Sequence, residues 1–276
     1  MANQPPARFL ESLPSFSPIA ARLLSLAFQE QASMREVGDL ISADPALTSD
    51  VLRLANSPLY ARQRDISSLL QAMALLGTDA VRGLVLTVAL RNFSHTATRS
   101  AVFQQCWRHC LACGLISADL AALTWKERDA AYTLGLLHDA GRLAMLAATP
   151  ISYGGLLKSG AASAQEMREK EREMFEVDHC EAGGWLAESW RLPHDFQRAM
   201  EHHHDDIDDG GYSLIVHWGC QLASMAGFQA WGEPTEWNTE GLQTLLRDAG
   251  PGILDASELI PRVAAGINSM ECTLSL

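Results

Sequence analysis

The spacing of apolar residues is the feature of this sequence that most restricts its fold. Apolar side chains recur three or four positions apart along most of the chain, as at Ile19, Leu23 and Leu26, whereas the alternation typical of half-buried strands is almost absent. Helix start signals agree with this spacing, because Asp44 precedes Pro45 and so places a capping carboxylate before a proline at the first helical position. The sequence therefore predicts an all-α fold.

The apolar pattern also predicts where the helices lie and how they are grouped. The predicted helices span residues 17–30, 34–43, 45–56, 66–76, 78–92, 99–123, 127–148, 164–174, 178–190, 194–204, 212–229 and 254–270. The segment RNFSHTATRS interrupts the pattern near residue 95, and Gly232 and Pro234 mark a later joint. We expect an N-terminal helical half over 10–95, a C-terminal half over 96–225 packed on it, and a helical extension over 226–276.

The charge of the chain argues against a nucleic-acid partner. With 21 Lys and Arg against 33 Asp and Glu among 276 residues, the formal net charge is −12, which repels a phosphate backbone unless basic residues are strongly segregated. The densest basic stretch, residues 53–64, holds only three arginines and is followed by an aspartate, a pattern typical of a solvated surface. We predict no nucleic-acid binding.

No segment predicts insertion into a membrane or export across one. Uninterrupted apolar stretches such as Leu134–Leu137 fall far short of the roughly 20 residues that a membrane span needs. The first residues, MANQPPARFLESLP, lack a basic segment followed by an apolar run. Three of the six cysteines, Cys106, Cys110 and Cys113, fall on one helical face, as expected for reduced thiols in a core. We therefore expect a cytoplasmic protein.

Histidines gather in the C-terminal half of the chain. Most of the nine lie between residues 109 and 217, on predicted helices that a bundle can bring to one point. Imidazole nitrogens and a carboxylate suit a first-row transition metal, and the adjacent His138 and Asp139 supply a nitrogen and a bridging oxygen from one helical turn. Two such ions would clamp a phosphate ester and activate a bound water. The alternative is structural: His109 bonded to a carbonyl inside the core, and His138 and Asp139 orienting each other.

Several segments resemble one family of bacterial proteins. They are, in order, LPSFSPIAARLLSL, LISADPALTSDVLRLANSPLY, ISSLLQAMALLGTDAVRGLVL, LLHDAG, EMFEVDHCEAGGWLAESWRLP and AMEHHHDD. Over about residues 10–225 the chain is similar to the HDOD domain, the HD-related output domain of bacterial signalling proteins, within the superfamily of HD phosphohydrolases. The resemblance implies a multi-helix HDOD-like bundle in which the N-terminal half packs on an HD-like C-terminal half.

The resemblance also implies a set of metal ligands. They are His109, His138, Asp139, His179, His203 and His204. His109 would be the first ligand, His138 and Asp139 the doublet, and the other three the ligands of a second ion; the set would hold one or two divalent ions of Fe, Mn, Zn or Ni. Because His202, His203 and His204 point in successive helical directions, at most two of them can face one site.

Two positions depart from the pattern of the superfamily. Its late aspartate is absent, and Cys220 stands at that place, where a thiolate can still bind a soft or borderline ion. Arg142 stands where the related HD-GYP phosphodiesterases carry a lysine, so in an enzyme it would contact phosphate. Arginine keeps the positive charge of the lysine, but its planar guanidinium binds with a different geometry from that of an ammonium group.

The functional expectation follows from the family. HDOD domains are regarded as signalling or interaction modules, so we expect a stand-alone module that binds a signalling protein acting in trans, such as a diguanylate cyclase, a phosphodiesterase or a receiver protein, or that binds a cyclic dinucleotide, without robust catalysis. The alternative is a metal-dependent phosphohydrolase acting on a nucleotide or cyclic dinucleotide. A third possibility is a purely structural ion that ties helices together.

Overall fold

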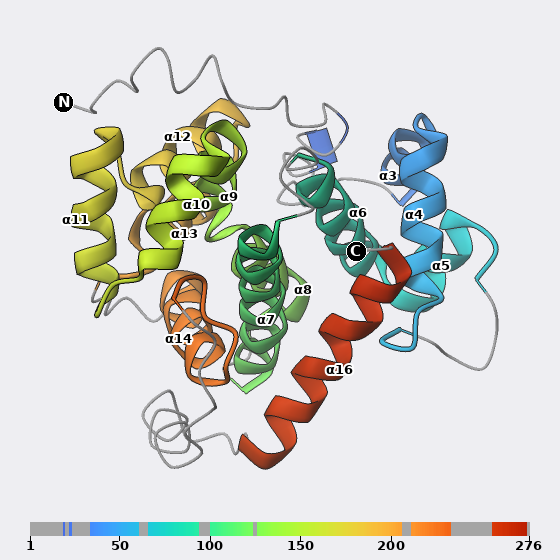
Figure 1. Ribbon diagram of the computed structural model, residues 1–276. Helices are drawn as coiled ribbons and strands as arrows, with labels where there is room; N and C mark the ends of the chain where they lie inside the picture. Colours follow the sequence, from blue (N-terminus) through green and yellow to red (C-terminus); the bar gives the residue numbers. More distant parts are fainter. Residues whose placement is uncertain are drawn as a thin grey trace.

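The computed structural model describes residues 19, 22–23, 34–60, 66–93, 100–123, 126–205, 211–232 and 256–274. Within these ranges every regular element is a helix (Figure 1), which confirms the all-α prediction. The helices are α3 (Met34–Ser42), α4 (Pro45–Ala55), α5 (Leu69–Leu76), α6 (Thr78–Phe93), α7 (Ala101–Leu123), α8 (Arg128–Leu137), α9 (Ala140–Ala148), α10 (Pro150–Ser159), α11 (Ala164–Phe175), α12 (His179–Ser189), α13 (His194–His202), α14 (Tyr212–Met225) and α16 (Ala256–Leu274). The predicted helix over 17–30 lies mostly outside the described residues, as does the interruption near residue 95.

Capping side chains start the helices at predicted places. Asp44 accepts hydrogen bonds from the backbone N–H groups of Ala46 and Leu47, each at 3.0 Å, and Pro45 is the first residue of α4. Asp178 and Glu181 form a reciprocal capping box at the start of α12. Such caps satisfy N–H groups that have no partner in the first turn, and each is worth about 1 kcal/mol.

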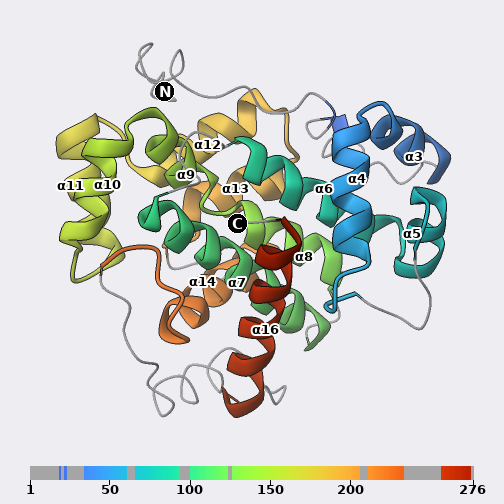
Figure 2. The ribbon, with the colours of Figure 1, turned by 45° about the vertical axis from the view of Figure 1, so that its right-hand side comes forward.

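Helix α7 is central to the C-terminal half. It packs along α8 and α14 and also contacts α9, α10 and α16. In Figure 1, α9 to α13 lie on one side of α7 and α3 to α6 on the other, and Figure 2 shows the same division from a second direction. Helix α6 connects the N-terminal helices to the centre of the molecule. It packs on α4 and α5 and also on α8, which lies along α7. Residues 81–90 of α6 are all buried, and most of them are apolar, as expected for a helix packed on every side.

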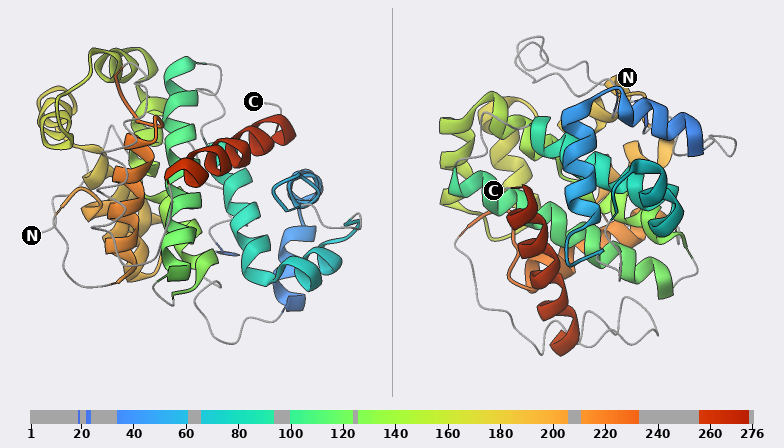
Figure 3. Two further views of the ribbon diagram at one scale, coloured as in Figure 1. Left: turned by 90° about the horizontal axis from the view of Figure 1, so that it is seen from below. Right: turned by 90° about the vertical axis from the view of Figure 1, so that its right-hand side faces the viewer.

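Helix α16 packs across the two groups of helices. It contacts α7 on one side and α4 on the other (Figure 3). Its apolar residues Leu259, Ile260, Val263, Ile267 and Met270 are buried. At its outer edge the Arg262 guanidinium bonds to Asp119 of α7 at 2.6 Å. Residues 256–274 of the C-terminal extension are therefore helical and belong to the common core.

The prediction of one helix over 127–148 is wrong, because the structure divides this segment into α8 and α9. The break falls at His138 and Asp139, and Asp139 has φ −105° and ψ 21°, outside helical geometry. The break turns the chain so that α8 packs along α7 while α9 packs on α12. The apolar pattern continues through both helices, which is why periodicity alone does not reveal the break.

Helix α10 was not predicted. Pro150 and the Gly154–Gly155 pair suggest a joint, yet Pro150 is the first residue of the helix, where its missing N–H costs nothing. Burial of Tyr153, Leu156 and Leu157 outweighs the low helix propensity of the two glycines.

Among the described residues, no helix combines the length and hydropathy of a membrane-spanning segment.

Candidate metal centre

All six predicted ligands converge in the C-terminal half. His109 lies on α7, His138 and Asp139 lie at the break between α8 and α9, His179 begins α12, and the pair His203–His204 follows α13. The first five of these, in chain order up to His203, expose 1% of their surface or less, and His204 is half-buried. The structure therefore brings together residues that lie up to 95 positions apart in the sequence, since 204 − 109 = 95.

A close approach of two helices places His179 in this group. A Cβ atom on Gly141 of α9 would collide with the carbonyl oxygen of His179 and would lie 2.5 Å from the amide nitrogen of Gly183. Only glycine fits here, so α9 and α12 meet backbone to backbone. This contact carries Asp139, two residues before Gly141, to the start of α12.

One group of possible ligands consists of His109, His138 and Cys220, and we call it the first cluster. His109 Nε2 lies 3.2 Å from His138 Nε2 and 3.5 Å from Cys220 Sγ. The other ring nitrogens face backbone carbonyl oxygens: His109 Nδ1 lies 2.7 Å from Phe228 O, and His138 Nδ1 lies 2.6 Å from Gly135 O. Because a carbonyl only accepts, each Nδ1 carries the proton and each Nε2 presents a lone pair to the cluster.

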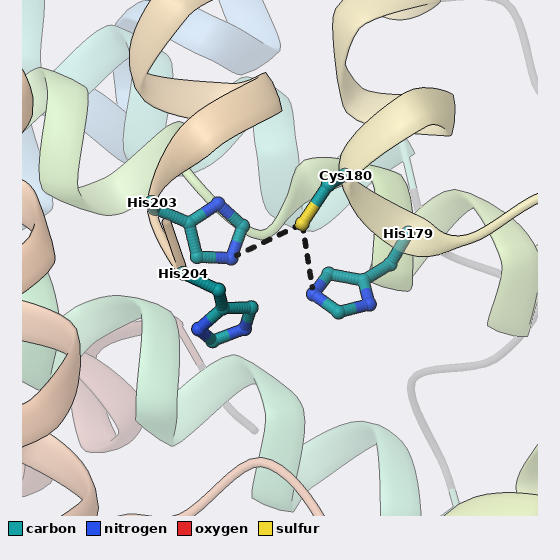
Figure 4. Close-up of side chains that lie close together, drawn as sticks. All are labelled: His179, Cys180, His203 and His204. Carbon is teal, nitrogen blue, oxygen red and sulfur yellow. Dashed lines mark hydrogen bonds between the residues drawn. The ribbon is translucent and has the colours of Figure 1, made fainter. Parts of the chain in front are cut away.

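A second group of possible ligands, the second cluster, consists of His179, Cys180, His203 and His204. Figure 4 shows Cys180 Sγ between two rings, 3.4 Å from His179 Nε2 and 4.0 Å from His203 Nε2. The ligand atoms of these four residues all lie within 4.8 Å of one another. The sequence did not predict Cys180 as a possible ligand. The one sequence feature that points to it is its position directly after His179.

Asp139 and Arg142 form a buried ion pair beside both clusters. Arg142 Nε donates to Asp139 Oδ2 at 2.7 Å, Nη1 donates to Glu171 at 3.1 Å, and Nη2 donates to His179 Nε2 at 2.9 Å. His179 Nδ1 in turn donates to Glu171 Oε2 at 2.6 Å, and Tyr153 donates to Glu171 Oε1 at 2.6 Å. Glu171 and Tyr153 lie on α11 and α10 and carry no motif that would mark them in the sequence.

Burial sets the protonation of these groups. It lowers the pKa of His138 to about 3, and it lowers the pKa of His109 and His203 as well. Burial also raises the pKa of the Cys220 thiol well above its usual value. For Asp139 burial acts toward a higher pKa, but the Arg142 guanidinium and the neighbouring imidazoles together outweigh it and hold the pKa well below the usual range. The inner surface thus includes the neutral imidazoles of His109, His138 and His203, thiols and an ionised carboxylate.

The chemistry of this inner surface fits a transition-metal ion. Asp139 Oδ1 is buried and has no hydrogen-bond partner among the residues that the structure describes, and it lies 3.7 Å from His179 Nε2 and 3.9 Å from His203 Nε2. His138, Asp139 and His203 form a third set whose ligand atoms are mutually within 4.8 Å. Lone pairs that converge without donors favour a bound cation. These buried His, Cys and Asp residues can therefore hold a metal.

Residues 226–232, which follow α14, cover the clusters. Phe228 supplies the carbonyl that holds His109, and the Trp231 ring lies over Arg142, with 5.0 Å between the guanidinium carbon and the ring centroid. The Trp231 indole N–H donates to Ala161 O at 3.2 Å, and the N–H of Gly232 donates to Leu157 O at 3.0 Å. The covering segment is thus anchored to α10 and to Ala161, which follows α10.

The remaining histidines of this region lie outside the ligand groups. His202 is half-exposed, and its Nδ1 lies 2.8 Å from Asp205 Oδ2, which agrees with the expectation that one of the three adjacent histidines faces water. His217 Nδ1 lies 2.9 Å from the carbonyl oxygen of His203. His217 therefore holds the backbone beside a candidate ligand, a role that sequence spacing does not show.

Comparison with known proteins agrees with this fold. The HDOD domain family matches residues 13–206. An HDOD domain protein from Geobacter sulfurreducens is 23% identical, with a TM-score of 0.75 over 97% of this chain and 95% of its own. A candidate phosphohydrolase from Shewanella amazonensis SB2B is 22% identical, with a TM-score of 0.73 over 97% and 98% of the two chains. These two likenesses are of fold alone.

Two further relatives share somewhat more sequence. The MmoQ response regulator from Methylococcus capsulatus is 30% identical, with a TM-score of 0.50 over 91% of this chain and 99% of its own. An uncharacterized protein from Treponema pallidum (strain Nichols) is 25% identical over 174 residues, or 62% of this chain and 34% of that protein. The chain thus spans about a third of the length of this curated relative. Because the family model matches residues 13–206, more than half of the chain, the chain belongs to the HDOD domain family.

Proposed function

We propose that this chain is an HDOD signalling module that acts by binding a partner and has no robust catalytic activity. The burial of the candidate ligands carries the proposal: His109, His138, Asp139, His179 and His203 expose 1% of their surface or less. Hydrolysis at a metal requires the phosphodiester to reach both the ion and its activated water. Burial at this depth, under the cover that includes Trp231, opposes such access.

The contacts of Arg142 support the same conclusion. Its side chain is fully buried, and Nε, Nη1 and Nη2 all donate to protein acceptors. A guanidinium that binds phosphate presents two parallel N–H groups to the oxygens. Those directions are already used by Asp139, Glu171 and His179, so contact with a phosphate would require breaking a buried ion pair.

The partners that we propose are signalling proteins acting in trans, such as diguanylate cyclases, phosphodiesterases or receiver proteins, or a cyclic dinucleotide. The similarity to MmoQ, named a response regulator, supports this class. Helices α3 and α5, which pack together, expose apolar side chains at Met34 (41%), Leu70 (63%) and Leu75 (40%). Large apolar side chains left exposed on neighbouring helices are typical of surfaces that another protein covers. We further expect the module to act in the cytoplasm.

We also propose that the buried clusters bind a divalent ion of Fe, Mn, Zn or Ni. When bound, such an ion would neutralise converging lone pairs and join ligands from α7, α14 and the α8–α9 break. His109, His138 and Cys220 would hold it on one side, with Asp139 and His203 nearby. Its contribution would be to folding, because a metal that binds only the folded state stabilises that state.

Hydrolysis assays test the proposed lack of catalysis. The full chain, refolded separately with each of the four metals, would be assayed with bis(p-nitrophenyl) phosphate and with cyclic di-GMP, beside an Asp139→Asn variant whose fold is checked by circular dichroism. We expect no turnover above that of the variant. Multiple turnovers that depend on Asp139 would contradict the proposal and support a metal-dependent phosphohydrolase.

Calorimetric titration tests the binding function. The purified chain would be titrated with cyclic di-GMP and with purified receiver, diguanylate cyclase and phosphodiesterase proteins, and we expect at least micromolar affinity for one of them. Leu70→Glu should weaken the binding of a protein partner at least tenfold. Ile151→Glu, at a residue 90% exposed on α10, is the control and should leave binding unchanged. Absence of binding throughout this panel would count against the proposal.

A further inference from the structure

The two nitrogens of the first cluster face each other without a proton to share. Both Nδ1 atoms donate to backbone carbonyls, so His109 Nε2 and His138 Nε2 direct lone pairs at each other across 3.2 Å. The Cys220 thiol has one proton, which it can donate to His109 Nε2 at 3.5 Å, and His138 Nε2 then still faces an acceptor. A cation between the three atoms satisfies all of them at once. Anchoring Nδ1 on a carbonyl is also the usual arrangement of a histidine that binds metal through Nε2.

The distances match a tetrahedral ion. With metal–nitrogen bonds of about 2.0–2.1 Å and metal–sulfur bonds of about 2.3 Å, neighbouring ligand atoms lie about 3.3 Å apart for two nitrogens and about 3.6 Å apart for nitrogen and sulfur. The corresponding separations here are 3.2 Å between the imidazole nitrogens and 3.5 Å between His109 Nε2 and Cys220 Sγ. Both separations from His109 Nε2 thus match one coordination sphere, and the ligand atoms of all three residues lie within 4.8 Å of one another.

The second cluster is different, because a cation of the protein already occupies part of it. Arg142 Nε donates a hydrogen bond to Asp139 Oδ2, and Arg142 Nη2 donates one to His179 Nε2. These are the carboxylate oxygen and the imidazole nitrogen on which a second ion would depend. A guanidinium has only donors, so His179 Nε2 must be the acceptor in this contact. An ion at His179 would have to displace a buried guanidinium from its ion pair.

The count of buried charges also favours one ion. Arg142 contributes one positive charge, and Asp139 and Glu171 contribute one negative charge each. His179 is neutral in this arrangement, because its Nε2 accepts from Arg142 and only its Nδ1 donates, so this buried group has an excess of one negative charge. A divalent ion bound by a deprotonated Cys220 adds two positive charges and one negative charge, which makes the whole group neutral. A second divalent ion would leave an uncompensated buried charge, which is strongly unfavourable.

We infer that this centre holds one metal ion, bound by His109 Nε2, His138 Nε2 and Cys220 Sγ, and that the Arg142 guanidinium stands in the place of a second ion. Binding releases the Cys220 thiol proton to solvent as the metal–sulfur bond forms. The nitrogen–sulfur ligand set departs from the histidines and aspartate that the family resemblance implies, and of the one or two ions that it allows, the geometry favours one. The inference rests on the metal binding proposed above, and the test below separates the failure of one from the failure of the other.

Cobalt(II) is a suitable probe, because a thiolate bound to it gives a charge-transfer absorption that imidazole and carboxylate ligands do not give. The full chain would be unfolded with chelator and refolded with increasing cobalt(II) chloride, and its spectrum and bound cobalt would be measured. We expect one equivalent of cobalt and a thiolate band. Cys220→Ser should remove the band and weaken cobalt binding at least tenfold, whereas Cys180→Ser, a matched buried cysteine in the second cluster, should keep both.

Each of the other possible outcomes contradicts either the one-ion inference or the proposed metal binding. Two equivalents of cobalt in the wild-type chain, or a band lost with Cys180→Ser but kept with Cys220→Ser, would overturn the inference alone. Bound cobalt without a thiolate band would likewise leave metal binding standing and remove Cys220 as a ligand. No bound cobalt would overturn both the inference and the proposed metal binding. Circular dichroism of each variant shows that the comparison is made on folded protein.

The role of Arg142 has its own test. Arg142→Met removes the cation but keeps most of the length of the side chain, which frees Asp139 Oδ2 and His179 Nε2. We expect this variant, refolded with cobalt, to bind two equivalents, and to be less stable than the wild-type chain when no metal is present. A folded variant that still binds one equivalent would show that Arg142 does not hold the place of an ion. If this variant does not fold, the wild-type stoichiometry alone still decides between one ion and two.

Discussion

At the scale of single residues, Asp139 and Arg142 form an ion pair inside the core. Both side chains are almost fully buried, at 2% and 0% exposure, and they are 2.7 Å apart. Removing one partner of such a pair leaves the other charge buried, which costs about 3–5 kcal/mol, whereas an exposed pair is worth under about 1 kcal/mol. The two cases can be compared within this chain.

Asp139→Asn should lower the free energy of unfolding by about 3–5 kcal/mol, because the Arg142 guanidinium loses a charged acceptor. Asp50→Asn is the matched control: it removes the same charge from the pair with Arg53, whose side chain is 49% exposed, and should cost under about 1 kcal/mol. Urea denaturation of metal-free protein measures both. Equal effects of the two substitutions would show that the buried pair does not contribute as its geometry indicates.

At the scale of helices, the contact of α9 with α12 places the candidate ligands. Gly141→Ala should lower the free energy of unfolding by about 1–3 kcal/mol or more, because the added methyl group collides with the backbone of α12. Gly155→Ala in α10 is the control, since nothing lies within 4 Å of its added Cβ, and it should stabilise the protein by about 0.5–1 kcal/mol. Thermal or urea denaturation of the pair gives the sign of each change.

The covering segment after α14 gives a second prediction at this scale. Trp231→Ala removes the ring that lies over Arg142 and beside His204. In a Cys272→Ser background, which lacks the exposed thiol, the labelling of buried thiols should become at least tenfold faster. Trp218→Ala, which removes an indole from α14, is the control and should change labelling much less. Equal rates for the two variants would show that Trp231 does not limit access to the clusters.

At the scale of the whole molecule, α16 ties the N-terminal group of helices to α7. Ile267 on α16 is fully buried, whereas Ile151 on α10 is 90% exposed. Ile267→Ala should therefore lower the free energy of unfolding by about 2–5 kcal/mol, whereas Ile151→Ala should change it by less than about 0.5 kcal/mol. Hydrogen exchange would also show faster opening of α4 and α7 in the first variant. Unchanged exchange in α4 would mean that α16 does not link the two groups.

The sequence by itself determined the helical class, most helix positions and the residues of the centre. These follow from local chemistry: the spacing of apolar side chains, the Asp44 cap, and imidazoles and a carboxylate set in motifs that resemble one family. All six predicted ligands do converge in the structure. Their roles as metal ligands, and the phosphate-contact role of Arg142, remain predictions.

Only the tertiary structure decided how the centre is closed and which cations it can take. The break at His138 and Asp139, the Gly141 contact, the place of Cys180 beside three histidines and the network of Arg142 with Glu171 all depend on helices distant in the sequence. The cover supplied by Phe228 and Trp231 depends on a segment beyond the family match. Periodicity reports which face of a helix is buried, but not what it is buried against. The partners of a buried charge are fixed by packing, because each must be brought there by another helix.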